Sequence, residues 1–446
     1  MKKDSPHLLL VNPWIHDFAA YDFWAKPLGL LQLAGILRAH DIRISYMDCL
    51  DRFHPRANVT RAQKRPGRGA YLKTRIPRPT GLKDVPRYFS RYGIPVEWFR
   101  EDLSNIPQPD VVMVTSLMTY WYPGVQEAIQ QTREMFPGTP ILLGGIYASL
   151  CREHASKESG ADRVFTGPGE GRVLDLVADA VGVSLASDFD PQDLDTHPYP
   201  AFDLQHWIPY VPILTSRGCP FTCTYCASHY LNPKIMRRSP ESVVEEIQYW
   251  HKTYGVIDFA FYDDALLVNA ENHIIPILEG VMTAGLQLRF HTPNALHVRE
   301  VTPQIARLMV LCGFESIRLG VETAAFEERG HLDKKITKGE FIKCIQSFKD
   351  AGFQKNQIGA YILVGLPGQS ISTVVDTIQA VKSAGAMPIM AYYTPIPHTV
   401  LWEEALASSR YDLALDPIYT NNAILPCQKE PFAWETLKRL KKLISE

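Results

Sequence analysis

Three cysteines stand close together near the middle of the chain, and their spacing is the feature most able to carry chemistry. Cys219, Cys223 and Cys226 lie in the segment RGCPFTCTYCAS and are spaced Cys-x3-Cys-x2-Cys. Three thiolates on one short loop can bind three irons of a [4Fe-4S] cluster. A cluster held by three protein ligands leaves its fourth iron open to a molecule outside the protein, and we expect chemistry at that iron.

The residues between the cysteines favour an iron-sulfur cluster over two alternatives. Pro220, Phe221 and Tyr225 form a stiff aromatic turn, which limits the access of water and tunes the reduction potential of a cluster. A zinc knuckle needs a fourth Cys or His, for which His229 is the near candidate. A chance group of buried thiols is the other alternative.

Composition indicates an ordinary globular protein with two or three domains. The 446 residues are 46% hydrophobic and 21% charged, and the net charge of -2 gives no overall attraction to nucleic acid or to an anionic membrane. No membrane span is expected, and the segment HLLLV near the N-terminus reads as a strand and not as a signal peptide. The other cysteines are scattered, which favours reduced thiols over disulfides and predicts a cytoplasmic protein.

Short apolar segments alternate with amphipathic ones over the first 187 residues. Those that read as strands are residues 7–11, 42–47, 111–115, 140–143 and 163–166. The clearest helices between them are expected at residues 28–39 and 124–135. This alternation predicts an α/β domain with a doubly wound parallel sheet, which binds ligands at the carboxyl ends of its strands, where the strand order reverses.

The expected carboxyl ends of these strands carry hydroxyl groups, glycines and aromatic rings. The candidate binding residues there are Ser116, Gly144, Gly145, Gly169 and Glu170. Paired glycines let a large planar or phosphate-bearing ligand approach the backbone. The aromatic run at residues 120–122 supplies a stacking wall beside them.

The order of these motifs resembles the cobalamin-binding domain that precedes one large class of radical S-adenosylmethionine (SAM) enzymes. In that domain a hydroxyl-bearing loop follows the third strand, Gly-Gly follows the fourth and Gly-x-Gly-Glu follows the fifth. The resemblance covers roughly residues 5 to 180. It implies that cobalamin contacts the five candidate residues named above.

One departure from that family concerns the lower face of the cobalt. The Asp-x-His-x-x-Gly motif that supplies a histidine ligand in mutase relatives is absent, and the corresponding loop reads NPWIHDFAAYDFW. His16 in this loop is expected to be a surface or packing residue. The sequence therefore predicts cobalamin without a protein ligand on its lower face, and the alternative is a domain that packs but binds no cofactor.

A basic segment interrupts the first domain. Residues 61–91 contain ten Lys or Arg against one acid, Asp84, and are rich in Pro and Gly, which predicts an extended loop. Such a loop holds an anionic substrate, the cobalamin phosphate tail or RNA, or else it is a solvated surface segment. We expect the first domain to span residues 1–187 with its insertion at 51–108, and a linker to follow at 188–209.

A second series of strands and helices begins after the linker. The expected strands are residues 213–218, 259–262, 288–291, 316–320, 359–364 and 388–392. Six such units predict a partial (β/α)6 barrel with its site at the carboxyl ends of the strands. Together with the cysteine motif, this series resembles the core of the radical SAM superfamily, which would cover residues 210–410 and leave 411–446 as a C-terminal extension.

This second resemblance assigns roles to residues at the strand ends. It implies that Asp263 faces the amino group of SAM, that Glu322 binds the ribose hydroxyls and that Gly365 offers backbone contact to the adenine. The preferred acid or base candidates are Tyr393 and His398, with His291 and His297 as further ones. Relatives usually carry Pro-Gly-Thr where His398 stands, so this histidine is a departure.

The resemblances imply a cobalamin-dependent radical SAM enzyme. An electron donor such as flavodoxin or ferredoxin reduces the cluster, SAM is cleaved to methionine and a 5'-deoxyadenosyl radical, and the radical takes hydrogen from a small-molecule substrate. Methyl transfer to an unactivated centre is the expected outcome, and the alternative is cyclisation, rearrangement or oxidation with or without cobalamin. A non-enzymatic iron-sulfur or corrinoid carrier and a methylthiotransferase are disfavoured. No membrane or nucleic-acid partner is expected.

Overall fold

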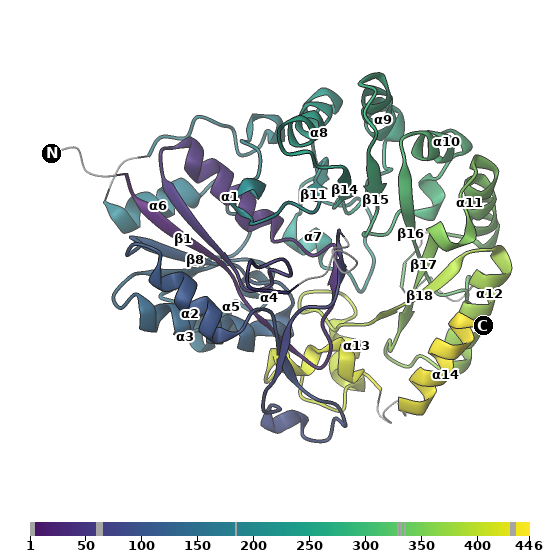
Figure 1. Ribbon diagram of the computed structural model, residues 1–446. Helices are drawn as coiled ribbons and strands as arrows, with labels where there is room; N and C mark the ends of the chain where they lie inside the picture. The colour runs from purple at the N-terminus through teal and green to yellow at the C-terminus, as the bar shows by residue number, and fades with distance from the viewer. Residues whose placement is uncertain are drawn as a thin grey trace. The chain divides into compact units, whose positions relative to one another are not determined.

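The computed structural model describes residues 5–58, 66–182, 185–327, 330, 332–333, 336–428 and 434–446. The chain forms two compact units (Figure 1). The first unit consists of Met1–Pro209 with Leu415–Ala423, and the second of Tyr210–Ala414 with Ile424–Glu446.

The first unit is built on a five-stranded parallel sheet in the order β10-β9-β8-β1-β4. Its strands are β1 (His7–Asn12), β4 (Arg43–Asp48), β8 (Val111–Val114), β9 (Ile141–Leu143) and β10 (Arg163–Val164). Leu8 and Leu10 of β1 pack with α1 (Leu28–Ala39) and α6 (Val173–Val181) on one face. The alternate residues of β1 pack with α2 (Val96–Ser104) and α3 (Tyr122–Met135) on the other face. The predicted doubly wound sheet is confirmed, and its strand order reverses between β1 and β8.

The basic insertion folds into short antiparallel strands. β6 (Lys73–Arg75) pairs with β7 (Ser90–Tyr92), which pairs in turn with β2 (Ile15–Asp17). β5 (Arg68–Gly69) pairs with β3 (Asp22–Phe23). The extended backbone that Pro and Gly predicted is therefore organised by ladder hydrogen bonds. Arg61, Lys64 and Arg65 lie outside the described residues.

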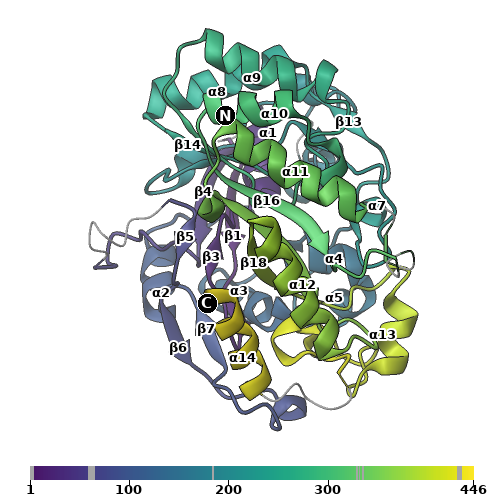
Figure 2. The ribbon, with the colours of Figure 1, turned by 90° about the vertical axis from the view of Figure 1, so that its right-hand side faces the viewer.

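The second unit is built on a six-stranded parallel sheet in which the strands follow one another in chain order. They are β11 (Val211–Ile213), β14 (Asp258–Phe261), β15 (Arg289–His291), β16 (Phe314–Glu322), β17 (Ile358–Val364) and β18 (Met387–Tyr392). The long helices between them are α8 (Pro240–Tyr254), α9 (Ile274–Thr283), α10 (Pro303–Leu311), α11 (Lys338–Ala351) and α12 (Ile371–Ala384). These helices run along the outer face of the curved sheet (Figure 2). The predicted partial barrel is confirmed.

Helix ends in the second unit follow the capping signals of the sequence. The Ser239 side chain accepts a hydrogen bond from the Ser242 N–H at the start of α8, where Pro240 is the first helical residue. Thr337 and Glu340 form a reciprocal capping box at the start of α11. These caps fix the first residues of α8 and α11.

The C-terminal part of the chain is divided between the two units. Thr420 Oγ1 lies 2.8 Å from Thr119 Oγ1, and the Asn421 amide donates to Asp17 Oδ1 at 2.9 Å, so this segment packs on the first unit. The last helix, α14 (Trp434–Ser445), packs against α12 and β18 of the second unit. Sequence reasoning had treated residues 411–446 as one extension.

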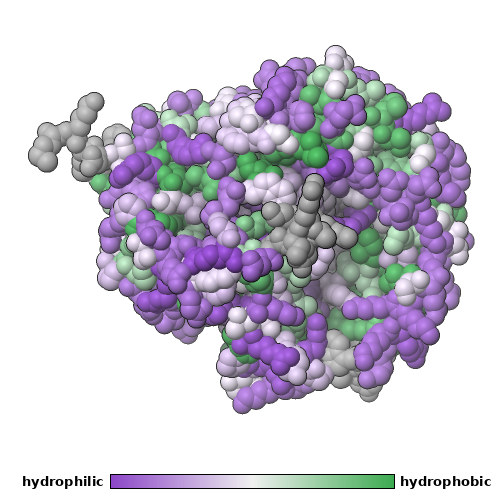
Figure 3. Space-filling view, in the orientation of Figure 1, coloured by the Kyte–Doolittle hydropathy of each residue, from purple (hydrophilic) through white to green (hydrophobic). Residues whose placement is uncertain are grey.

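No helix among the described residues is long and apolar enough to cross a membrane. Hydrophilic residues make up most of the surface on the face drawn in Figure 3.

Candidate functional site

The three cysteines lie on the loop between β12 (Ser216–Arg217) and α7 (Ser228–Leu231). All three are free thiols: Cys223 is buried, Cys226 is exposed and Cys219 is between these extremes. Burial raises the pKa of Cys219 to about 11, so this thiol loses its proton near neutral pH only when a metal takes its place.

The donors that this loop offers are the three cysteine thiols. The described residues contain no group of three or more His, Cys, Asp or Glu side chains placed to hold one ion. A tetrahedral zinc site requires four such donors to converge. In a [4Fe-4S] cluster each thiolate binds a different iron, so three cysteines on one loop fit that group.

The cysteine loop is tied to the rest of the second unit through the residues between its cysteines. The Thr224 N–H donates to the Leu332 carbonyl at 2.9 Å, and the Leu401 N–H donates to the Thr224 carbonyl at 2.9 Å. The Tyr225 hydroxyl donates to Glu322 Oε1 at 2.9 Å. The loop that carries the thiols is thereby linked to the carboxyl end of β16.

Glu322 occupies an unusual position at that strand end. Its φ of 60° lies in the left-handed region, which a non-glycine residue rarely adopts, and its side chain is buried. The carboxylate lies over Gly320, where a Cβ atom would come within 2.9 Å of Oε1. Backbone strain of this kind costs about 1–3 kcal/mol and persists where the surroundings hold the residue in place, as the Tyr225 hydrogen bond does here.

The two acids that follow β14, Asp263 and Asp264, have different hydrogen-bond partners. Asp263 is buried and accepts hydrogen bonds from Thr215 Oγ1 and Ser216 Oγ, both at 2.7 Å. Burial nevertheless raises its pKa. Asp264 has its pKa raised by burial, against a hydrogen bond with Ser228 of α7, which follows the cysteine loop. Sequence reasoning chose the first acid of the pair, whereas the structure places the second one beside the cysteine loop.

The remaining candidates of the second unit are spread over two strand ends. Gly365 has a φ of 94°, and its N–H donates to Gln369 Oε1 at 2.8 Å. Tyr393 is buried, and its hydroxyl has no hydrogen-bond partner among the described residues. His398 is exposed, has a φ of 67° and stacks on Tyr230 with 4.3 Å between ring centroids. A left-handed backbone at His398 gives a physical reason for the glycine that relatives carry there.

A cavity of about 230 Å³ opens beside the ends of β16 and β17. Thr323 and Leu366, which follow Glu322 and Gly365 in the chain, are among its lining residues. Two of the three residues assigned to SAM by the resemblance, Glu322 and Gly365, are therefore each followed in the chain by a residue that lines this cavity.

In the first unit, the predicted hydroxyl and glycine residues contact one another. Ser116 is fully buried, and its hydroxyl donates to the Gly144 carbonyl at 2.7 Å. Gly145 has a φ of 97°, and a Cβ atom there would overlap the backbone of Ser116. Gly144 has open space where its Cβ would be. Packing alone explains why position 145 is glycine, so Gly144 is the residue that offers a cradle to a ligand.

The other cobalamin candidates lie on the loop that follows β10. A Cβ atom on Gly169 would come within 3.1 Å of the Leu33 side chain on α1, and Glu170 is buried. His16, the residue of the missing histidine motif, lies 2.7 Å from Glu127 Oε2 through its Nε2. That contact agrees with the predicted packing role for His16.

The aromatic run after β8 is anchored within the first unit. Tyr120 is buried, the Trp121 indole donates to Asp17 Oδ2 at 2.7 Å, and the Tyr122 hydroxyl donates to Asp416 Oδ2 at 3.0 Å. The polar atoms of Trp121 and Tyr122 are thus hydrogen-bonded to the protein itself.

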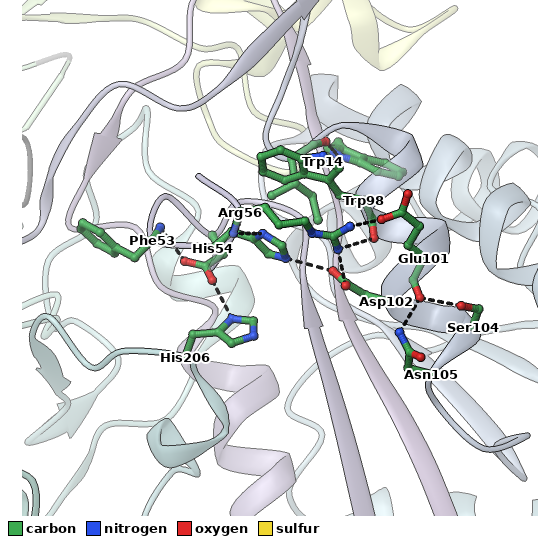
Figure 4. Close-up of polar contacts among 12 residues, drawn as sticks. Trp14, Phe53, His54, Arg56, Trp98, Glu101, Asp102, Ser104, Asn105 and His206 are labelled. Atoms are coloured by element: carbon green, nitrogen blue, oxygen red, sulfur yellow. Dashed lines mark hydrogen bonds and ion pairs between the residues drawn. The ribbon is translucent and has the colours of Figure 1, made fainter. Parts of the chain in front are cut away.

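A second polar cluster in the first unit lies beside the end of β4 and was not anticipated from the sequence (Figure 4). His206 Nδ1 lies 2.9 Å from Asp51 Oδ2, and His54 Nε2 lies 2.9 Å from Asp102 Oδ2. Arg56 pairs with the same Asp102. A cavity of about 230 Å³ adjoins these groups. Because Asp51 contacts His206, and Asp102 contacts His54 and Arg56, these contacts connect the loop after β4, α2 and the segment before the second unit.

Comparison with known proteins covers both units. The model of the radical SAM superfamily matches residues 213–381, and the model of the B12 binding domain matches residues 95–177. An uncharacterized methyltransferase of Pyrococcus horikoshii is 26% identical over 68% of this chain and 70% of its own length. The anaerobic magnesium-protoporphyrin IX monomethyl ester cyclase of Rubrivivax gelatinosus is 25% identical over 68% of this chain and 60% of its own length.

A solved structure shares the fold over most of the chain. The radical SAM methyltransferase TsrM from Kitasatospora setae, with tryptophan substrate and a SAM analogue bound, superposes with a TM-score of 0.64 at 16% identity. The superposition covers 91% of this chain and 78% of TsrM.

Proposed function

Because the chain belongs to the radical SAM superfamily and carries a B12-binding domain, we propose that it is a cobalamin-dependent methyltransferase acting at an unactivated centre of a small molecule. The observation that carries the proposal is the link between the cysteine loop and the strained Glu322 through Tyr225. This contact joins the residues that would hold the cluster to the carboxylate that would hold SAM. Relatives named methyltransferases, and a TsrM structure with tryptophan, support the class of reaction and of substrate.

In this proposal each residue of the second unit has a defined task. Cys219, Cys223 and Cys226 would hold the cluster through three of its irons. Glu322 accepts hydrogen bonds from the ribose hydroxyls of SAM, while Tyr225 keeps one of its oxygens in place. Asp264 is the better partner for the SAM amino group, because Asp263 is committed to Thr215 and Ser216. When bound, the cluster, SAM and cobalamin supply reductive cleavage of SAM, hydrogen abstraction and a transferable methyl group.

His398 and Tyr393, which follow β18, would exchange protons or hydrogen bonds with the substrate. The exposed His398 is held in one ring orientation by its stack on Tyr230, which suits a general base that must meet a substrate from solvent. Tyr393 lies in a buried site that keeps its phenol protonated, since burial raises its pKa far above the usual value. Its hydroxyl could donate a hydrogen bond to a bound ligand. An electron donor such as flavodoxin or ferredoxin would complete the system.

The first unit would hold cobalamin through its backbone, with Gly144 as the closest approach. Ser116 fixes the Gly144 carbonyl, and His16 is engaged by Glu127. We therefore expect no protein nitrogen on the lower face of the cobalt. The electron paramagnetic resonance spectrum of the reduced corrinoid on the protein should lack nitrogen hyperfine splitting.

A second candidate is a radical SAM cyclase, because one of the similar relatives carries that name. Both reactions would begin with the same hydrogen abstraction, so the two candidates differ in the fate of the SAM methyl group.

Tracing that methyl group separates the two candidates. Anaerobic protein with reconstituted cluster and hydroxocobalamin is treated with titanium(III) citrate, which reduces the cluster and converts the corrinoid to cob(I)alamin, and is then incubated with SAM labelled in its methyl carbon. The methyltransferase proposal predicts labelled methylcobalamin on the protein, and a Cys223→Ala variant serves as the control for the cluster. Corrinoid that stays unlabelled, with 5'-deoxyadenosine still formed, would favour the cyclase.

A further inference from the structure

One histidine of the second unit lies against a cysteine of the cysteine loop, although the two residues are far apart in the sequence. His297 Nε2 is 3.9 Å from Cys219 Sγ. The His297 side chain is buried, and its ring centroid is 3.9 Å from that of Phe221. The imidazole is therefore packed between the loop and the strand ends, with one ring nitrogen directed at the thiol.

The backbone around His297 fixes this position. The preceding residue, Leu296, forms a parallel bridge with Leu319 of β16, with N–H donation to the Arg318 carbonyl at 2.8 Å. The Leu296 carbonyl accepts from the Gly320 N–H at 3.1 Å. The residue before His297 is thus hydrogen-bonded to β16, which fixes the backbone that carries the imidazole.

Cys226 has different surroundings from Cys219. The contacts of Cys226 with Ser228 are local, with the Ser228 N–H at 3.4 Å and the Ser228 hydroxyl at 3.3 Å. A local N–H to sulfur contact follows from the turn that any such loop makes. The contact of His297 with Cys219 requires a particular side chain at a distant position, so it can be removed without changing the loop.

We propose that His297 is a positioning residue that raises the reduction potential of the cluster by donating its Nε2–H to the Cys219 sulfur. A hydrogen bond withdraws electron density from a ligand sulfur and so stabilises the reduced cluster. Phe221 holds the ring in the plane that keeps the donor aimed at the sulfur. This inference rests on the proposed function, since it presumes a cluster on the three cysteines.

The test is a redox titration of the reconstituted protein followed by electron paramagnetic resonance. His297→Phe keeps an aromatic ring against Phe221 but lacks the N–H donor. We expect its midpoint potential to fall by about 59 mV, which is a tenfold change in equilibrium constant for a one-electron couple. His297→Gln retains a donor and should recover part of the shift. His251→Phe, at a histidine of α8 whose ring contacts the Val256 carbonyl, is the matched control and should titrate like the wild type.

Resonance Raman spectra give a second readout that does not depend on catalysis. Exchange into heavy water should shift an iron-sulfur stretching band of the wild type and leave that band of His297→Phe unmoved. Equal potentials and equal isotope shifts in wild type and His297→Phe, at equal iron content, would overturn the inference. So would loss of the cluster in both His297 variants, because His297 would then be needed for assembly. If the wild type itself takes up no cluster, the proposed function fails instead.

Discussion

The two parallel sheets of this protein use their carboxyl strand ends in opposite ways. In the first unit, the predicted ligand-binding hydroxyl of Ser116 is bonded to the protein itself, at the Gly144 carbonyl, and open space lies where Gly144 lacks a side chain. In the second unit, three thiols and the strained Glu322 gather around one loop. The first unit offers backbone to a ligand, whereas the second offers ligating groups.

This difference predicts how substitutions should act. Removing a side chain should abolish function in the second unit, and adding one should abolish it in the first unit. The predictions below follow from this contrast, from the largest expected effect to the smallest.

Cys223→Ala should remove the cluster and all SAM cleavage, because two thiolates cannot hold three irons. Iron and sulfide analysis after anaerobic reconstitution measures the effect, with about four irons expected for the wild type. Cys312→Ala is the matched control: Cys312 is also buried, but its thiol donates to the Leu278 carbonyl away from the loop. Full iron content in Cys223→Ala, or its loss in both variants, would contradict the assignment.

Gly144→Val and Gly145→Val should separate ligand binding from folding in the first unit. A side chain at Gly144 enters open space, so the unit should keep its fold and lose corrinoid affinity by at least about tenfold. A side chain at Gly145 meets the Ser116 backbone at a positive φ, so this variant should lose the fold as well. Corrinoid titration and circular dichroism measure the two effects. Unchanged affinity in a folded Gly144→Val protein would show that cobalamin does not approach there.

Glu322→Gln should weaken SAM binding ten- to a hundredfold, about 1.5–3 kcal/mol, because the ribose hydroxyls would lose a charged acceptor. The amide oxygen can still accept from Tyr225, so the fold of the loop should survive. Equilibrium binding of SAM to the reconstituted protein is the measurement. Glu315→Gln, at an exposed position of the same strand, should bind normally. Equal affinities in the two variants would remove Glu322 from the SAM site.

The polar cluster beside β4 should make a small, pH-dependent contribution to the stability of the first unit. The hydrogen bond with Asp51 raises the pKa of His206. Burial acts to raise the pKa of Asp51, but the hydrogen bond with His206 and neighbouring contacts outweigh burial, so the pKa of Asp51 is lowered. The His206 contribution is complete below about pH 6.5 and is lost as pH rises through the folded pKa, while that of Asp51 is lost at acidic pH.

His206→Asn should therefore lower the urea midpoint more at pH 5.5 than at pH 8.5. The side chain of His206 is 56% exposed, so solvent screening keeps the effect below about 1 kcal/mol. A loss of equal size at both pH values would show that the contact does not depend on charge.

Much of this fold could be predicted because local patterns and tertiary packing agree. The apolar spacing of residues 28–39 gave the bounds of α1 without error, and the buried runs in both halves became central parallel strands. The segment at 415–423 could not be placed, because its tie to the first unit is the contact of Asn421 with Asp17, 404 residues away in the chain.

The site could be predicted only where neighbouring residues form a recognisable motif. The cysteine loop could be read directly, but nothing in the string Tyr-Asp-Asp shows that Asp263 would face Thr215 and that Asp264 would lie with Ser228. Gly145 was expected to face a ligand, whereas the structure explains it by the approach of the Ser116 backbone. Such distinctions depend on which way a strand end turns, and only three-dimensional packing determines that.

The central claim is that the second unit carries out radical SAM chemistry, and the most direct test is to count 5'-deoxyadenosine. The protein is reconstituted anaerobically, reduced, incubated with SAM and assayed for this nucleoside. The account predicts that the wild type produces 5'-deoxyadenosine and that Cys223→Ala produces none. A wild-type protein with about four irons per chain that binds SAM and still releases no 5'-deoxyadenosine would contradict the account.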